Sequence, residues 1–400
     1  MSDRPPRLVL VNRLYWPSAE ATAQLLTDLA EGLASRGRDV HVLAAGEAST
    51  RQHGVTIHRT GTPENHTGLV SRALAYRRFL RAARRQLPAL VQPGDVVVTM
   101  TDPPLLGTVV AETLAGRGVA VVQWIQDIYP EIAVVHFGSV AGFLLGGWQR
   151  RRNRAWAQSA ACVTLGADMA QAVTAAGVAA DRLTLLPNWA PRELDETAPA
   201  AAVAACRERW NAGDRFVIAY SGNLGRVHEF ATILDAAEQL KSDAGIAFRF
   251  IGRGPQWAKV AAAVQQRDLA NVALQPPVPR PELGAMLAAA DAHLVTLRPA
   301  YGRLVYPSKL AGVLAAGRPA LFVGPPDGDI ARLLRTEECG AAFAPGAAGE
   351  LAETIRHWAG DRAAAGRFGT NARRTYAAQF TFGTALDRWD QLLHRLAVRA

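Results

Sequence analysis

The order in which short apolar runs and helical patterns follow one another is the feature of this sequence that most constrains its fold. Leu8 to Val11 is an apolar run of the length expected for a buried parallel strand. After a polar loop, apolar residues recur at helical spacing from Leu25 to Leu33, and a second apolar run follows from Val40 to Leu43. The same order returns between Asp95 and Trp124. Strands that alternate with helices in this way predict an α/β fold with a parallel sheet covered by helices on both faces.

A second series of strands and helices begins after an irregular, Pro- and Ala-rich passage from Pro187 to Ala205, which we interpret as a linker. Its strands are expected at 216–220, 247–251 and 320–323, among others. The chain of 400 residues is long enough for two such domains. Because ligands of parallel sheets bind beyond the carboxyl ends of the strands, two Rossmann-like, doubly wound domains that face one another predict a small-molecule site in the cleft between them.

Composition narrows the class of protein. Hydrophobic residues make up 49% of the chain, and no run of 18 apolar residues suggests a membrane-spanning helix. The three cysteines, Cys162, Cys206 and Cys339, are far apart, so neither a disulfide framework nor a metal cluster is indicated. Together with the lack of an apolar signal-peptide core from Met1 to Arg7, this fits the reducing cytoplasm. The net charge of +9 suits nucleic acid, an anionic bilayer or nucleotide substrates, and does not choose among them.

The segment Pro307-Ser308-Lys309 predicts an anion site. Serine is a favoured N-cap, so a helix should begin here, and Gly317 should close it before a buried strand. The free N–H groups at a helix start, the helix dipole and the ammonium group of Lys309 together favour an anionic ligand, most naturally phosphate. The alternative is a solvated lysine at the start of a surface helix.

Two glycine-rich loops follow strands in the same half of the chain. The first runs from Gly222 to Arg226, where unobstructed backbone N–H groups lie beside a guanidinium that can bind a diphosphate through two hydrogen bonds. The second, Gly252-Arg253-Gly254, could approach a nucleobase closely. Each alone is compatible with a tight turn, and neither matches the dinucleotide or Walker patterns. Three such features at strand ends of one half nevertheless reinforce one another.

These residues resemble a known family. Tyr220 to Arg226, Phe250 to Gly254 and Pro307 to Pro319 look like the nucleotide-sugar half of GT-B glycosyltransferases, specifically the retaining family 4. The loop at Tyr15-Trp16-Pro17 and the segment Asp127 to Glu131 resemble the acceptor half of the branch that builds O-antigens and capsules, whose members include N-acetylfucosamine transferases.

The resemblance implies an architecture and a reaction. Residues 1–190 would form an acceptor-binding domain, residues 191–378 a nucleotide-sugar-binding domain, and residues 379–400 a helix that crosses back to the first domain. The reaction would be a retaining hexosyl transfer in which the departing phosphate oxygen helps to deprotonate the acceptor hydroxyl, without a cofactor or metal. A UDP-sugar is the favoured donor, and a GDP-sugar is possible. The rate should then depend mainly on how the protein positions the two substrates and how it stabilises the negative charge of the leaving group.

The resemblance also implies roles for individual residues. Lys309 and Arg226 match the cations that hold the diphosphate. Gln126 stands where relatives often place a His near the sugar, so Asp127 is the candidate for acceptor orientation or base work, unless it caps a helix near Pro130. The donor-binding residues expected are Gly222, Asn223, Gly225, Arg226, Gly252, Arg253, Ser308, Lys309 and Leu310, and those of the amino-terminal loop near the diphosphate or acceptor are Ser18, Ala19 and Glu20.

The sequence departs from the family pattern in several places. The familiar paired glutamates would fall at Leu304 and Gly312, and His228 stands about where relatives carry a lysine. Alternative carboxylates lie at Asp327 and Asp329. Their Asp-Gly-Asp spacing resembles a metal-binding motif of the other glycosyltransferase fold, but Asp329 precedes a helical pattern, so an N-cap is the better interpretation.

Two stretches of the amino-terminal half are both basic and apolar. Residues 72–85 contain six arginines and no acid, with apolar residues at helical spacing, and 143–148 runs into the arginine-rich segment 150–154. Such a surface suits an anionic membrane leaflet, and the acceptor in the resembling branch would be lipid-linked. The alternative is ordinary core beneath a solvated arginine face. We expect a cytoplasmic protein, peripheral on the inner face of the membrane, with no nucleic-acid partner.

Two other classes of protein stay open. A nucleotide-sugar 2-epimerase of the same two-domain form would convert the donor alone. A non-catalytic protein that binds anionic lipid or polyanions would do so in a salt-sensitive manner, without stabilisation by UDP or GDP. The strand-end glycine loops argue against this last class.

Overall fold

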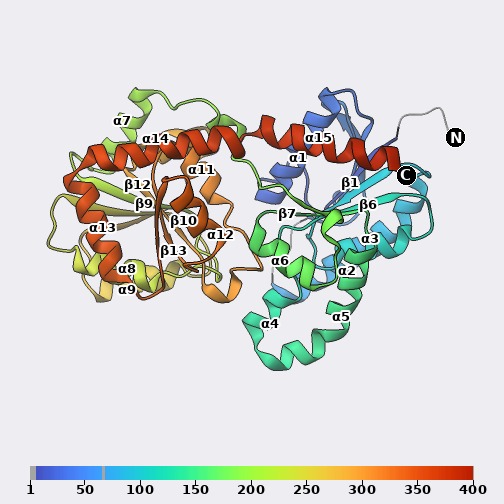
Figure 1. The fold of residues 1–400 in the computed structure, drawn as a ribbon, viewed down its shortest axis with the longest axis horizontal. Helices are drawn as coiled ribbons and strands as arrows, with labels where there is room; N and C mark the ends of the chain where they lie inside the picture. The colour runs from blue at the N-terminus through green and yellow to red at the C-terminus, as the bar shows by residue number, and fades with distance from the viewer. Residues whose placement is uncertain (1–5, 65–67, 400) are drawn as a thin grey trace. The chain divides into compact units, whose positions relative to one another are not determined.

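The computed structural model describes residues 6–64 and 68–399, which divide into two compact units. The amino-terminal unit comprises residues up to Pro187, the short segment Arg303–Tyr306 and the chain from Gly383 onward. The carboxy-terminal unit comprises Asn188–Gly302 and Pro307–Phe382. Each unit is an α/β body built on a parallel sheet, as the alternation of strands and helices in the sequence predicts (Figure 1).

The amino-terminal unit has one sheet with the strand order β3-β4-β2-β1-β5-β6-β7-β8. All neighbours are parallel except β3 and β4, which form an antiparallel pair that the sequence patterns do not predict. The carboxyl ends of β1, β5 and β6 therefore meet at one edge of the sheet. The strands are β1 (Leu8–Val11), β2 (Val40–Ala44), β3 (Thr50–Gln52), β4 (Val55–Arg59), β5 (Val96–Thr99), β6 (Ala120–Trp124), β7 (Ala161–Thr164) and β8 (Leu183–Leu185).

Helices cover both faces of this sheet because successive strand residues point to opposite sides. Val9 and Val11 pack with residues of α2 and α3, whereas Trp124 meets Trp389 of the last helix edge-on, with ring centroids 4.9 Å apart. Arg38 also binds Asp390 at 2.6 Å, so the last helix is anchored to this unit. The helices are α1 (Ala21–Ser35), α2 (Leu69–Leu90), α3 (Leu106–Leu114), α4 (Glu131–Phe137), α5 (Ser139–Gln158), α6 (Ala167–Ala175), η1 (Ala180–Arg182) and α15 (Phe382–Arg399).

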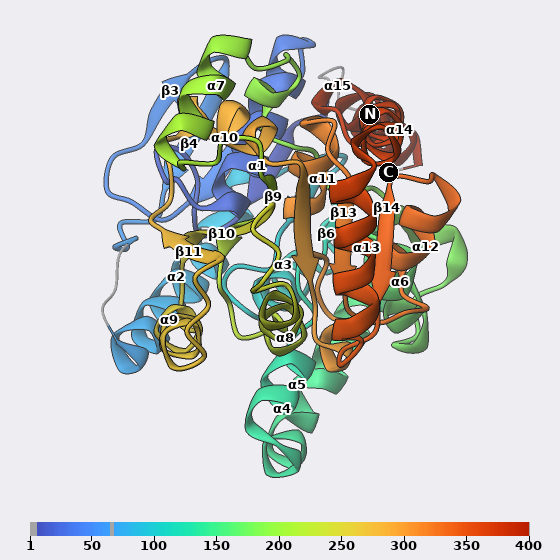
Figure 2. The ribbon, with the colours of Figure 1, turned by 90° about the vertical axis from the view of Figure 1, so that its left-hand side faces the viewer.

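The two basic, apolar stretches of the sequence fold differently from each other. In α2, the apolar residues Phe79, Ala83 and Leu87 are fully buried in the core of the amino-terminal unit, so the prediction of an apolar membrane face is wrong for this helix and its arginines form a solvated face. Helices α4 and α5 instead form a hairpin that projects from its unit in both views (Figures 1 and 2). Phe143 on this hairpin is 90% exposed.

The carboxy-terminal unit has a wholly parallel sheet with the strand order β11-β10-β9-β12-β13-β14. The order reverses between β9 and β12, and parallel sheets bind ligands beyond the carboxyl ends of the strands at such a switch point. The strands are β9 (Phe216–Asn223), β10 (Ile246–Arg253), β11 (Val272–Gln275), β12 (Ala292–Thr296), β13 (Ala320–Val323) and β14 (Gly340–Phe343).

The helices of this unit lie on both faces of the sheet. Residues of α8, α9 and α13 fill one hydrophobic core with the strands, and α7, α10, α11 and α14 pack in pairs elsewhere. The helices are η2 (Arg192–Leu194), α7 (Ala200–Arg209), α8 (Ala231–Gln239), α9 (Trp257–Gln266), η3 (Arg280–Glu282), α10 (Leu283–Ala289), η4 (Pro299–Tyr301), α11 (Lys309–Ala315), α12 (Asp329–Thr336), α13 (Ala348–Gly360) and α14 (Arg362–Gln379).

Two local predictions need correction. The passage interpreted as an irregular linker up to Ala205 already contains α7 from Ala200 onward, because this Ala-rich run packs on α10. The first glycine loop is shorter than predicted, since Gly222 and Asn223 pair with Gly252 and Arg253 as the last residues of two neighbouring strands.

Candidate functional site

Glycines shape the carboxyl ends of β9 and β10. Gly222 has a φ of +127°, and a Cβ atom at Gly252 would lie 1.9 Å from the carbonyl oxygen of Gly222. A Cβ atom at Gly254 would lie 2.3 Å from Oδ1 of Asn223. Only glycine fits at these positions, so the two strand ends approach closely and leave backbone groups unobstructed at this edge.

Lys309 reaches the same strand end from the start of α11. Its Nζ lies 3.8 Å from the centre of the Tyr220 ring and donates a hydrogen bond to the Tyr220 hydroxyl. A Cβ atom at Gly222 would lie 3.6 Å from this nitrogen, so the structure brings together two residues that the sequence predicted for one site. Burial lowers the pKa of Lys309 to about 7.

His228 packs edge-on against the ring of Tyr220, which also contacts Lys309. Its Nδ1 lies 2.6 Å from the carbonyl oxygen of Thr296, which can only accept, so this nitrogen carries the proton. Burial, followed by the charge of Lys309, lowers the pKa of His228 to about 3. His228 is therefore a neutral imidazole that keeps its other ring nitrogen as an acceptor. The sequence had marked it only as a departure from the family pattern.

The other residues predicted to bind the sugar donor differ in exposure and in the groups that could contact a ligand. Arg226, after β9, and Arg253, the last residue of β10, are exposed, as a diphosphate or nucleobase contact requires. Ser308 stands at the predicted N-cap position and is exposed, but its side chain makes no capping hydrogen bond. Leu310 is fully buried, so only its backbone can face a ligand. Arg298, which the sequence analysis did not select, donates to the carbonyl oxygen of His228 at 3.0 Å.

One of the two predicted alternatives to the missing glutamates, Asp329, takes a structural role. Asp329 is the first residue of α12 rather than its N-cap, which is Gly328, and it forms an ion pair with Arg332. A side chain at Gly312 would contact Leu194 and Leu287 at 3.6 Å, so this position faces the core. Within residues 6–64 and 68–399, no three His, Cys, Asp or Glu side chains are grouped as a metal site would require.

Asp127 follows β6 in the amino-terminal unit. It caps no helix, because α4 begins at Glu131 behind Pro130 and has no side-chain capping bond. Its backbone pairs with Val305 in an isolated antiparallel bridge. The carboxyl group receives no hydrogen bond from any described residue, and burial, with a smaller contribution from the charge of Asp102, raises its pKa to about 6. A carboxyl group whose pKa lies this close to neutral pH is suited to orient or deprotonate a hydroxyl group.

Residues that the sequence did not identify follow the neighbouring strands of the same sheet edge. Arg13, after β1, forms an ion pair with Asp102, after β5, at 3.0 Å. Burial raises the pKa of two tyrosines, Tyr76 and Tyr129; the charge of Asp102 adds to this for Tyr76, and the charges of Asp127 and Asp102 add to it for Tyr129. Polar residues directly after predicted parallel strands were the signal that could have identified Arg13 and Asp102.

The segment that carries Asp127 is fixed by Arg152 of α5. The guanidinium of this buried residue lies 3.9 Å from the Trp156 ring centre, donates to the carbonyl oxygen of Tyr129 at 2.8 Å, and binds both carboxylate oxygens of Glu131 at 2.7 and 2.9 Å. Glu131, the first residue of α4, is thus an ion-pair partner of Arg152. These contacts hold the chain on the carboxyl side of Asp127 against α5.

The loop from Ser18 to Glu20 precedes α1 at the carboxyl end of β1. Ser18 is half-buried, Ala19 and Glu20 are exposed, and the carbonyl oxygen of Ala19 accepts from Gln24 at 2.9 Å. The backbone at the start of α1 is therefore accessible, as the prediction of a ligand contact requires, although no side chain of the three is aimed by a partner outside the loop.

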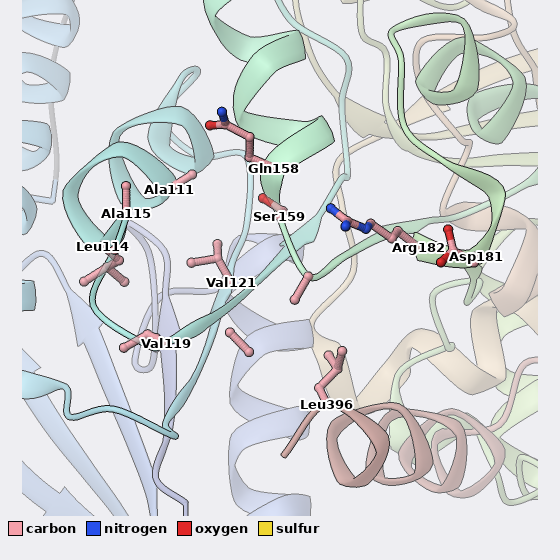
Figure 3. A pocket seen from close by; sticks show the side chains of 14 residues that line it. Ala111, Leu114, Ala115, Val119, Val121, Gln158, Ser159, Asp181, Arg182 and Leu396 are labelled. Atoms are coloured by element: carbon pink, nitrogen blue, oxygen red, sulfur yellow. The ribbon is translucent and has the colours of Figure 1, made fainter. Parts of the chain in front are cut away.

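A cavity of about 490 Å³ lies at the opposite edge of the amino-terminal sheet, beside the first residues of β6 and the residues preceding β7 (Figure 3). Leu114, Val119, Val121 and Leu396 give it an apolar wall, and Arg182 lies at its rim (Figure 3). None of the predicted site residues lines it.

Each of the two units matches a known protein family. Residues 21–189 match the family model for a glycosyl transferase 4-like domain, and residues 205–375 match that for glycosyl transferases group 1. WcaI of Escherichia coli K12, described as a colanic acid biosynthesis glycosyl transferase, is 31% identical over 161 residues, which are 40% of this chain and only 39% of WcaI. WbjE of Pseudomonas aeruginosa, described as a glycosyltransferase, is 30% identical over 278 residues, or 68% of this chain and 67% of WbjE.

The solved structure of HepE from Anabaena in complex with UDP superimposes with a TM-score of 0.71 at 15% identity and covers 97% of this chain and 100% of HepE. Two parallel-sheet α/β units with this likeness define a GT-B protein. With both family models and WbjE matched, the chain belongs to the family 4 glycosyltransferases. Among the residues described, no helix is at once long and apolar enough to span a bilayer.

Proposed function

We propose that this protein is a retaining, metal-independent hexosyltransferase that moves a sugar from a UDP-sugar to a hydroxyl group of a lipid-linked acceptor during synthesis of an envelope polysaccharide. The observation that carries the proposal is the position of Lys309 beside Gly222 at the carboxyl end of β9. The description of WcaI supports a polysaccharide pathway, and the UDP complex of HepE supports UDP over GDP. N-acetylfucosamine is the first sugar to test, because the sequence resembles transferases of that type.

The donor would be held by its diphosphate. We assign this role to the backbone at the end of β9, the ammonium of Lys309 and the exposed guanidinium of Arg226. Negative charge builds up on the departing phosphate as the glycosidic bond breaks, and fixed positive groups stabilise that charge most in the transition state. Lys309 and Arg226 therefore serve both binding and departure of the nucleotide.

The acceptor hydroxyl would be oriented by Asp127. The bond from the anomeric carbon to the phosphate oxygen breaks, the bond to the acceptor oxygen forms on the same face, and the acceptor proton passes to the departing phosphate oxygen. Before this step the acceptor hydroxyl donates a hydrogen bond to Asp127, which places its oxygen for attack and lowers the entropic part of the barrier; the proton turns to the phosphate oxygen as the new bond forms.

A thermal-shift panel of UDP, GDP, ADP and dTDP tests the donor assignment. A ligand at one hundred times its Kd stabilises a folded protein by about 2.7 kcal/mol, so UDP should raise Tm measurably. Lys309→Met should lose most of this increase, whereas Lys259→Met, on an exposed position of α9, should keep it. The assignment is wrong if no nucleotide raises Tm, or if Lys309→Met responds like the parent.

The second part of the proposal places the protein on an anionic membrane surface through the α4–α5 hairpin. Large apolar side chains are exposed on it, and Arg150 and Arg154 are exposed on the adjoining part of α5. Apolar side chains beside cations suit the interface of an anionic leaflet, where a lipid-linked acceptor would be presented. The exposed apolar residues are Val135, Phe137, Phe143, Leu144 and Trp148.

A further inference from the structure

A cavity of about 570 Å³ lies within the carboxy-terminal unit, and its walls come from α10, the end of α11, the residues that follow η2, and α14. Because α11 ends just before β13, this cavity lies beside the amino end of that strand. Lys309, at the other end of α11, lies at the carboxyl end of β9 instead. The volume is that of a small-molecule site, and none of the residues assigned to the sugar donor lines it.

Three arginines line the cavity. Arg373 of α14 donates to three backbone carbonyl oxygens, among them that of Leu194 at 3.0 Å, and Arg318, which precedes β13, donates to that of Ala288. Carbonyl groups hold these two guanidinium groups in place but do not neutralise their charge. Arg374, the next residue of α14, is exposed. Among the described residues, no carboxylate forms an ion pair with any of the three.

The acidic groups near the cavity leave most of this positive charge uncompensated. Glu196 is the one carboxylate among the described residues that line it, so the lining carries a net charge of two positive. Burial lowers the pKa of Arg318, and Asp291, whose charge acts in the opposite direction, is already bound by Arg207 and Arg362. The cavity therefore favours an anion.

The charge and the donor groups select a class of anion. A phosphate monoester carries a charge of about −1.5 to −2 at neutral pH and presents three acceptor oxygens, which matches the net charge of the lining. Guanidinium groups bind phosphate oxygens in pairs of parallel hydrogen bonds. A single carboxylate group would compensate only half of the net charge. The volume leaves room for an organic part beside the phosphate.

We propose that this cavity binds a small organic phosphate, a phosphate monoester, through Arg318, Arg373 and Arg374. The site is separate from the edge of the sheet that would hold the sugar donor. The inference does not depend on the proposed transfer reaction, because none of its residues belongs to the donor or acceptor assignments. A ligand that bridges these arginines connects α14 with the segment between α11 and β13, and it should stabilise the folded chain.

Isothermal titration calorimetry on the full chain tests this inference. The probes are glycerol 3-phosphate, glucose 6-phosphate and inorganic phosphate, and glycerol, glucose and acetate are the controls. At least one of the two monoesters should bind with a Kd of about 1 mM or below, and the three controls should not. Arg374→Gln should weaken this binding at least about tenfold, the factor expected when hydrogen bonds to a charged group are lost. Arg367→Gln, an exposed arginine of the same helix outside the cavity, should bind like the parent.

A further variant separates this site from the donor edge, where phosphate is also expected to bind. Lys309→Met should keep the binding of the monoester, and Arg374→Gln should have the same effect in the Lys309→Met background. The inference is overturned if neither monoester binds the parent, if acetate binds equally well, or if Arg374→Gln keeps the affinity of the parent. Loss of monoester binding in Lys309→Met, with binding retained in Arg374→Gln, would place the phosphate at the donor edge and would likewise overturn it.

Discussion

The Nζ of Lys309 lies 3.8 Å from the centre of the Tyr220 ring, and the neutral imidazole of His228 packs edge-on against the same ring. Among the described residues no carboxylate forms an ion pair with Lys309. The free-energy cost of burying its ammonium group is therefore offset only by the Tyr220 ring and by a hydrogen bond to the Tyr220 hydroxyl. The charged form of a lysine in this situation is destabilised by burial, and a bound anion stabilises it again. This relationship is what the proposed diphosphate contact of Lys309 requires.

Nucleotide binding should therefore take up a proton. Burial lowers the pKa of Lys309 to about 7 in the free protein, and a bound diphosphate requires the charged form. Above pH 7 the affinity for UDP should fall, by at most about tenfold per pH unit, because the lysine must be protonated before it can bind. Calorimetric titration of UDP between pH 7 and 9, in buffers of different ionisation enthalpy, measures both effects. Lys309→Met should bind weakly with little change over this range, and equal pH slopes in the two proteins would contradict the prediction.

Replacement of Asp127 by asparagine should stabilise the fold and lower activity. The pKa of Asp127 is raised to about 6, above its value in an unfolded chain, so its contribution to stability is lost as pH rises from about 4 to 6 and is unfavourable at pH 8. Asp127→Asn should then have a higher Tm than the parent at pH 8, and the difference should vanish near pH 4. Turnover should fall by about 10² or more, because the acceptor hydroxyl is then no longer held in position for attack. Unchanged turnover with unchanged UDP binding would remove Asp127 from the site.

Gly254→Ala should disturb the donor edge. The added Cβ atom would lie 2.3 Å from Oδ1 of Asn223 and 2.8 Å from the backbone nitrogen of Leu224, so the strand end must shift, at a cost of about 1 to 3 kcal/mol. Both Tm and UDP affinity should decrease. Gly366→Ala in α14 is the matched control, because nothing lies within 4 Å of its Cβ position and alanine favours a helix by about 0.5 to 1 kcal/mol. A Gly254→Ala variant with the UDP affinity of the parent would show that this loop does not contact the donor.

The sequence predicted those parts of the fold that depend on local pattern. Apolar runs such as Leu8 to Val11 became strands, and the segments around Gly222 and Lys309 lie together as expected, because strand-end loops of a parallel sheet meet at one edge. Helix starts were accurate to about one residue, as Asp329 illustrates.

What the sequence could not supply is pairing between distant residues. Arg13 and Asp102 are 89 positions apart, and only the order of β1 and β5 in the sheet makes them partners. The same limit applies to the amphipathic helices. The periodicity of α2 does not reveal that Phe79 packs with strand residues, whereas Phe143 of α5 remains outside the core. Both helices have similar sequence patterns, but the topology of the sheet packs the apolar residues of α2 into the core and leaves those of α5 on the surface.

The α4–α5 hairpin should bind anionic vesicles through its exposed apolar side chains. Burying a large apolar side chain contributes about 1.5 to 3 kcal/mol, so replacing both Phe143 and Leu144 by serine should reduce binding to phosphatidylglycerol vesicles at least tenfold in a flotation assay. The matched control replaces Val70 and Leu74, exposed at the start of α2, by serine and should bind like the parent. Emission from Trp148 should shift to shorter wavelength when anionic vesicles are added and should not shift with neutral vesicles. Equal binding of the two double variants would assign membrane attachment to another surface, and salt-resistant binding to neutral vesicles would show that the arginines of α5 do not contribute.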